Sequence, residues 1–80
     1  MRLKIMTFGI TRDIIGSSLV EVEIPEGSSA TDLKTKLETT YPAIKKLKSL
    51  LIAINEEYGD DDYILQEKDD IALIPPVSGG

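Results

Sequence analysis

The sequence has no cysteine and no histidine, and these two absences exclude much of protein chemistry. Without cysteine there is no disulfide, no thiolate nucleophile and no thiolate ligand for a metal. Without histidine the chain lacks the most common general base of enzymes. The aspartates at 60–62 lack the spacing of a calcium loop, and no glycine-rich phosphate loop is present. We expect a chain that binds no metal or cofactor of its own and is not an enzyme by itself.

Long apolar runs are also missing. No stretch approaches the roughly 18 apolar residues of a membrane span. The first residues, MRLKIM, lack the apolar region and the cleavage site of a secretion signal. A chain of 80 residues forms one small domain, which buries only about 60% of the surface of its unfolded form. We expect a single cytoplasmic domain over residues 1–80 that has no membrane partner.

Charge is unevenly distributed along the chain. Residues 1–50 contain eight lysines and arginines and six acidic residues, whereas residues 51–80 contain one lysine and eight acidic residues. Phosphate contacts need clustered cations, so nucleic acid is not expected as a partner. Two readings of the acidic half stay open. It attracts a basic protein partner, or it is a solvated surface that keeps a small protein in solution.

Hydrophobic periodicity predicts one sheet and one main helix. The segment LVEVEI places three apolar side chains on one face and two glutamates on the other. Leu3 and Ile5 alternate with charged residues, while Met6 and Phe8 have the opposite parity, so Phe8 is expected on a different face. Ser29 and Asp32 form a capping box for a helix that Pro42 ends. The predicted strands are residues 2–8, 19–24, 50–54, 63–65 and 71–74.

The predicted boundaries include several turns. Residues 10–15 are predicted to form one helical turn closed by Gly16, and residues 43–49 a further turn carrying Ile44 and Leu47. Residues 55–62 are predicted to form a turn with a bend at Gly59. The continuous apolar runs at 50–54 and 71–74 predict buried strands. Because one helix covers one face of one sheet, the fold class is α+β, and the element order fits a β-grasp, or ubiquitin-like, fold.

The end of the chain is the remaining chemical group of interest. Pro75 and Pro76 restrict the backbone, and Gly79 and Gly80 have no side chains, so residues 75–80 are expected to form a slender tail outside the core. A carboxylate becomes reactive once it is activated, for example as an acyl-adenylate. Taken alone, a terminal Gly-Gly is weak evidence and slightly favours a frayed end that has no function.

Three segments of the sequence match the pattern of a known protein family: EKDDIALIPPVSGG, FGITRDIIG and LIAINEEY. Together they resemble the small subunits of molybdopterin synthase, the sulfur carriers of molybdenum-cofactor synthesis, over nearly the whole chain. The resemblance implies that an adenylyltransferase of the ubiquitin-activating type, using its own ATP and magnesium, adenylates Gly80. Sulfur then converts Gly80 to a thiocarboxylate, which is donated to the precursor pterin in the large subunit of molybdopterin synthase. A heterotetramer of two carriers on a large-subunit dimer is implied in the same way.

The resemblance also implies roles for individual residues. Val77, Ser78 and Gly79 would thread into the partner, with Gly80 as the reacting residue. Partner-binding positions correspond to Phe8, Arg12, Tyr58 and Ile74, where Ile74 stands in place of a residue that is often aromatic. For the apolar positions among them, ordinary core packing is the alternative, and for Arg12 a plain surface charge.

Three other functions compete with this one. The nearest is a sulfur carrier of thiamine synthesis, although its tail usually lacks the Pro-Pro pair. A ubiquitin-like modifier that forms isopeptide bonds with lysines belongs to a different class, and so does an interaction domain whose Gly-Gly has no role. The fold by itself does not choose among them.

Overall fold

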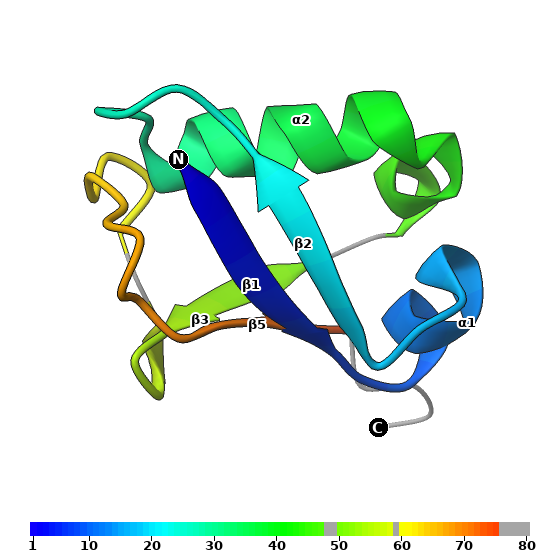
Figure 1. Cartoon of the computed structure of the whole chain (residues 1–80). Helices are drawn as coiled ribbons and strands as arrows, with labels where there is room; N and C mark the ends of the chain where they lie inside the picture. Colours follow the sequence, from blue (N-terminus) through cyan, green and yellow to red (C-terminus); the bar gives the residue numbers. More distant parts are fainter. Residues whose placement is uncertain (48–49, 59, 76–80) are drawn as a thin grey trace.

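The computed structural model describes residues 1–47, 50–58 and 60–75. Within this part of the chain, five strands form one mixed sheet, and the longest helix lies across one face of it (Figure 1). The elements follow in the order β1 (Arg2–Thr7), α1 (Ile10–Ile15), β2 (Leu19–Glu23), α2 (Ala30–Thr40), the 3-10 helix η1 (Pro42–Lys46), β3 (Leu51–Ile54), β4 (Glu57–Tyr58) and β5 (Ile71–Ile74). The two-layer α+β architecture predicted from the sequence is confirmed.

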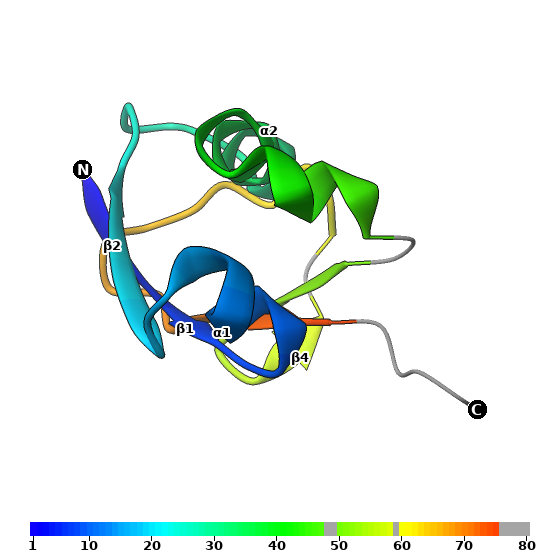
Figure 2. The same cartoon turned by 90° about the vertical axis from the view of Figure 1, so that its right-hand side faces the viewer.

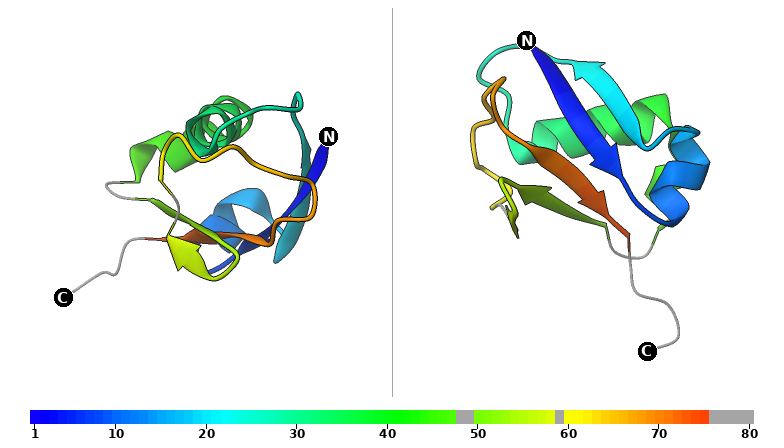
Figure 3. Two further views of the ribbon diagram at one scale, coloured as in Figure 1. Left: turned by 90° about the vertical axis from the view of Figure 1, so that its left-hand side faces the viewer. Right: turned by 60° about the horizontal axis from the view of Figure 1, so that its bottom comes forward.

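The strand order decides where the chain leaves the sheet. It is β2-β1-β5-β3-β4, so β5 is central although it is the last strand in the chain. β5 pairs in parallel with β1 and antiparallel with β3, while β1–β2 and β3–β4 are antiparallel pairs. Figure 3 shows β1 and β5 running side by side. Periodicity did not predict this strand order, which places the end of β5 and the following Pro75 in the middle of the sheet.

Strand β1 has the alternation of a sheet with one covered face. Leu3, Ile5 and Thr7 are buried under the helix, whereas Met6 and the following Phe8 are exposed. The change of parity at Met6 therefore places apolar side chains on the uncovered face and does not interrupt the strand. The prediction that Phe8 lies on a different face from Leu3 and Ile5 is confirmed.

Helix α2 begins at the predicted capping box. The Asp32 amide donates to Ser29 Oγ at 3.2 Å, and the Ser29 amide donates to Asp32 Oδ2 at 2.9 Å. Leu33 and Leu37 are completely buried against the sheet, and burying one such side chain contributes about 1.5–3 kcal/mol. The helix ends before Pro42, as expected.

Two short helical segments complete the helix layer, and both were predicted. α1 ends at Gly16, which has a left-handed φ of 88° and donates its N–H to the Arg12 carbonyl. η1 buries Ile44, while part of the predicted turn, residues 48–49, lies outside the described residues. Among the residues that the structure describes, no helix combines the length and apolar composition that crossing a bilayer requires.

Three predictions about the second half of the chain were wrong or incomplete. Strand β3 is not buried on both faces, because Leu51 lies on the uncovered face and is 47% exposed. Residues 63–65 form no strand; only an isolated bridge joins Ile64 to Ser29. The two-residue strand β4 was missed because Glu57 lies in a polar, turn-like sequence. The bend predicted at Gly59 lies outside the described residues.

A tight hairpin connects β3 and β4. Ile54 pairs with Glu57, which leaves Asn55 and Glu56 as a two-residue loop. Both have positive φ, 54° for Asn55 and 70° for Glu56. Two-residue loops with positive φ at both positions match the right-handed twist of the flanking strands, and their preferred sequence is Asn-Gly. Asn55 suits its position, whereas Glu56 is strained there.

We therefore expect Glu56→Gly to stabilise the protein by about 1 kcal/mol, because glycine removes the cost of a left-handed backbone. The melting temperature should rise by about 4–8 °C for a domain of this size. Glu56→Ala is the matched control, because it removes the same charged side chain and keeps the strain. Equal stabilisation by glycine and alanine would show that backbone strain at this position is not the cause.

Candidate functional site

The uncovered face of the sheet, opposite α2, consists of a charged half and an apolar half. The register aligns Met6 of β1 with Ala72 of β5, Ala72 with Ala53 of β3, and Ala53 with Tyr58 of β4. One row further along β5, Ile74 pairs with Leu51. The apolar patch is defined by these side chains and Phe8: Met6, Phe8, Leu51, Ala53, Tyr58, Ala72 and Ile74.

The apolar patch is exposed to a degree that core packing does not explain. Phe8 is 47% exposed and Tyr58 is 69% exposed, and Met6 and Leu51 are exposed as well. Adjacent exposed apolar side chains on a small domain mark a surface that another molecule covers. Aromatic residues and methionine are also the types enriched in protein interfaces. Core packing is therefore wrong for Phe8 and Tyr58, whereas Ile74 is half-buried.

The four predicted partner-binding residues are only partly brought together. Phe8 and Ile74 follow the paired residues of β1 and β5 and lie at the same end of the sheet. Tyr58 reaches the apolar patch from the opposite edge, on β4, which is separated from β5 by β3. Arg12 is exposed on α1, the short helix that follows β1 in the chain (Figure 2).

Thr11 on α1 holds the backbone of Phe8 in place. Its side chain is completely buried. Thr11 Oγ1 accepts the Phe8 amide at 3.0 Å and donates to the Phe8 carbonyl at 2.6 Å. Both backbone groups of Phe8 are thus bound by one side chain, which fixes the strand end. No sequence pattern distinguishes such a threonine from an exposed one.

Gly9 lies against the start of the predicted tail. Its φ of 55° and ψ of −130° are strained for any residue with a Cβ. A Cβ there would also stand 3.2 Å from Pro75 Cγ. Glycine therefore permits close contact between Gly9 and Pro75, the last described residue. The predicted threading residues Val77, Ser78 and Gly79 and the reacting Gly80 lie outside the described residues.

A buried carboxylate ties the hairpin that carries Tyr58 to the segment before β5. Asp69 is 4% exposed and accepts hydrogen bonds from Asn55 Nδ2 at 3.0 Å, from the Gln66 amide at 2.8 Å and from the Tyr63 hydroxyl at 3.1 Å. Asn55 Oδ1 accepts the Asp70 amide at 3.0 Å. This network secures the β3–β4 hairpin against the central strand.

The network shifts two pKa values in opposite directions. Burial alone would raise the pKa of Asp69, but the hydrogen bonds from Asn55, Gln66 and Tyr63 outweigh it and lower the pKa. Burial raises the pKa of the Tyr63 hydroxyl, and the hydrogen bond to Asp69 and the negative charge of Asp69 raise it further. The lowered pKa means that the folded state favours the charged form of Asp69, so this charge stabilises the fold.

Comparison with known proteins assigns a family. The model of the ThiS family matches residues 5–80. The molybdopterin synthase sulfur carrier subunit of Dictyostelium discoideum is 37% identical, in an alignment that covers 99% of this chain and 96% of that protein.

Solved structures agree with that assignment. A putative molybdopterin converting factor subunit 1 from Pyrococcus furiosus superposes with a TM-score of 0.88 at 26% identity, covering 96% of this chain and 99% of that one. A complex of subunits 1 and 2 of the molybdopterin-converting factor from Helicobacter pylori contains a chain that matches with a TM-score of 0.68 at 25% identity, covering 100% of both chains.

The Asp69 network predicts a pH-dependent cost for Asn55→Gly, a change that keeps the positive φ tolerable. Because the folded pKa of Asp69 lies below its unfolded value of about 3.9, its stabilising effect is complete above that value. The effect disappears as pH falls through the folded pKa. We expect Asn55→Gly to lower the free energy of unfolding by about 1–3 kcal/mol at neutral pH. In acid the decrease should be smaller. Urea unfolding across pH measures this, and a cost independent of pH would contradict it.

Proposed function

The chain belongs to the ThiS family, alongside the sulfur carrier subunits of molybdopterin synthase, and on that premise we propose that it is the sulfur carrier subunit of a molybdopterin synthase. The observation that carries this proposal is the identity of 30–37% to such subunits over at least 98% of the chain. The exposed apolar patch beside Pro75 supports it, because a carrier must dock before its tail can react.

The proposed chemistry takes place on Gly80. A partner adenylyltransferase joins the Gly80 carboxylate to the AMP part of ATP and releases pyrophosphate, with magnesium held by that enzyme. A sulfur donor then displaces AMP and leaves a thiocarboxylate. In the large subunit the thiocarboxylate sulfur would displace an oxygen leaving group from a carbon of the precursor pterin and form an acyl thioester. Water would then cleave the acyl–sulfur bond, which leaves the sulfur on the pterin and regenerates the Gly80 carboxylate. This chain contributes the acyl group and the docking surface.

The residues of this chain have three tasks in the proposed cycle. β5 directs the chain out of the centre of the sheet, and Gly9 lets Pro75 pass close to the strand end. The slender Val77–Gly80 segment would enter a narrow channel, where the absence of Cβ atoms at its last two residues is an advantage. The effective concentration of a reactant tethered in this way is high, which lowers the entropic part of the barrier.

We propose that the large subunit covers the apolar patch through Phe8, Ile74 and Tyr58, with Arg12 at its margin. Subunit 1 of the Helicobacter pylori factor forms a complex with subunit 2, which supports a partner of this type. The activating adenylyltransferase would use the same end of the domain, because it must reach the same glycine. Two carriers on a large-subunit dimer would make the heterotetramer.

The proposed reaction predicts a change of mass at Gly80. Incubation with the activating enzyme, ATP and a sulfur donor should raise the intact mass by the difference between sulfur and oxygen, with the change located at Gly80. A variant lacking Gly80 should keep its fold and show no gain. Transfer of the sulfur to the thiazole precursor of thiamine in place of the pterin would favour the thiamine carrier. Isopeptide conjugates to lysine would favour a modifier.

The proposed docking of the apolar patch on the large subunit predicts that a charge at Phe8 weakens binding. Phe8→Asp should weaken binding to the large subunit by at least about tenfold, because buried aromatic anchors contribute most of the affinity of an interface. Ile64→Asp is the matched control, since Ile64 is 52% exposed and bridges to Ser29 at the start of α2, away from the apolar patch. Calorimetry measures both, with circular dichroism to verify folding. Equal affinity of the two variants would place the interface elsewhere.

A further inference from the structure

Strand β2 is the outer strand at one edge of the sheet, and two of its residues offer unpaired backbone groups there. Met1 and Ile24 exchange backbone hydrogen bonds, and the Thr7 amide donates to the Ser18 carbonyl. In an antiparallel pair such bonds alternate along the strand. The N–H and C=O groups of Glu21 and Glu23 therefore point away from β1, and no described residue pairs with them.

One end of this edge is closed by the chain itself. Ser17 Oγ donates to the Leu19 carbonyl at 2.8 Å and accepts the Leu19 amide at 3.3 Å. Leu19 is the next edge-facing residue in the same alternation. Ser17 thus occupies its backbone groups and leaves Glu21 and Glu23 as the open part of the edge. An open strand edge is a template for another extended segment.

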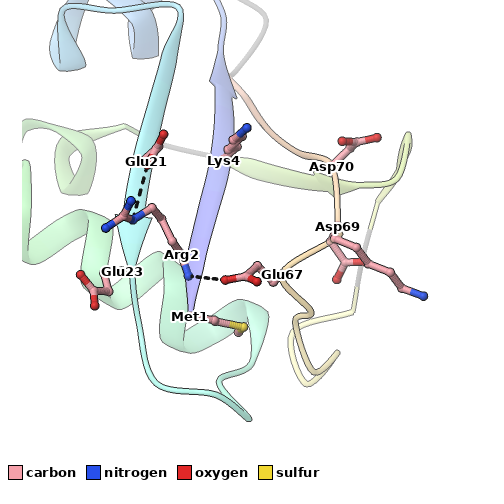
Figure 4. Close-up of a pocket in the computed structure, with 9 residues that line it drawn as sticks. Met1, Arg2, Lys4, Glu21, Glu23, Glu67, Asp69 and Asp70 are labelled. Atoms are coloured by element: carbon pink, nitrogen blue, oxygen red, sulfur yellow. Dashed lines mark hydrogen bonds and ion pairs between the residues drawn. The ribbon is translucent and has the colours of Figure 1, made fainter.

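The charges of the uncovered face continue in rows up to this edge (Figure 4). Lys4 lies across from Glu21 on one side, and the β1–β5 register places Asp70 on its other side. Arg2 lies across from Glu23, and its amide bonds Glu67 Oε1 at 3.2 Å. From the segment before β5 outward, both rows are negative, positive, negative, and the Arg2 side chain reaches diagonally to Glu21, with 3.5 Å between Nε and Oε2. Because cross-strand pairs of opposite charge are stabilising, the next strand in each row would carry a cation.

On the side that faces α2, the edge of β2 borders a groove. A groove of about 590 Å³ lies between the end of β2 and α2 and is lined by Ile24, Pro25, Thr35, Lys36 and Thr39, among others. Its wall also carries the charged residues Glu26, Asp32 and Lys36, while the apolar atoms of Ile24, Pro25 and the two threonines accept aliphatic groups. Successive residues of an added strand would point alternately to the charged rows and to this groove.

We propose that the open edge of β2 binds an extended segment of a partner protein in which basic and apolar residues alternate. The basic residues pair with Glu21 and Glu23, and the apolar residues enter the groove beside α2. A second copy of this chain does not fit, because β2 would bring its own glutamates against Glu21 and Glu23. The edge lies two strands away from β5, so this segment and a partner of the C-terminal end can bind together.

The test uses two short synthetic peptides, one of alternating lysine and valine and one of alternating glutamate and valine. In ¹⁵N NMR titrations of the full chain, the lysine peptide should shift and protect the Glu21 and Glu23 amides, and the glutamate peptide should not bind. Glu21→Pro should weaken the lysine peptide about tenfold, because it removes one edge donor while an outward-facing edge position tolerates proline. Ser17→Ala should extend the protected amides to Leu19.

A charge exchange keeps the proposal testable if Glu21→Pro does not fold. The double variant Glu21→Lys and Glu23→Lys should bind the glutamate peptide and lose the lysine peptide. Shifts centred on the acidic residues 60–62, or unchanged affinity for folded Glu21→Pro, would overturn the proposal and indicate general charge attraction. Absence of binding by the lysine peptide would overturn it as well. None of these outcomes depends on sulfur transfer, so they leave the proposed carrier function unaffected.

Discussion

The constraint on which this structure depends is that one amphipathic helix covers one face of a sheet. α2 buries Leu33 and Leu37 against the strand residues of the covered face, and Leu3 and Ile71 meet it from below. The other face has no cover among the described residues. The chain has divided it into a charged half toward the start of β1 and an apolar half toward the end of β5. The face that α2 does not cover therefore presents a charged surface and an apolar surface to solvent.

The central position of β5 connects the apolar patch to the proposed chemistry. Because β5 runs parallel to β1, both strands finish at the same end, with Ile74 next to Phe8 and Pro75 against Gly9. Thr11 fixes the Phe8 backbone, and the Asp69 network holds the hairpin of Tyr58 on the far side. A partner that covers the apolar patch therefore lies beside the point where the chain leaves the sheet. Rigid docking beside a slender tail is what a carrier requires.

Local patterns predicted much of the fold, and failures occurred where tertiary context decides. The capping box at Ser29 correctly predicted the start of α2, and the alternation of apolar and charged residues predicted β2. Each pattern depends only on residues that are neighbours in the sequence. The run at 50–54 was wrongly predicted to be buried on both faces, because in sequence an apolar residue on the uncovered face, such as Leu51, cannot be distinguished from a buried one. Within the site, the parity of Phe8 was informative, whereas Thr11 and Gly9 were missed because their roles depend on contacts made only in the folded chain. The proposed role of Gly80 rests on family resemblance and lies outside the described residues.

The most direct measurement of the central claim is hydroxyl-radical footprinting of the carrier, alone and bound to the large subunit of molybdopterin synthase. If the uncovered face docks there, oxidation of Met6, Phe8 and Tyr58 falls strongly in the complex. Tyr41, at the end of α2, stays equally reactive and serves as the internal reference. Protection of Tyr41 with undiminished oxidation of Met6 and Phe8 would contradict the account, because the helix layer would then be the docking surface.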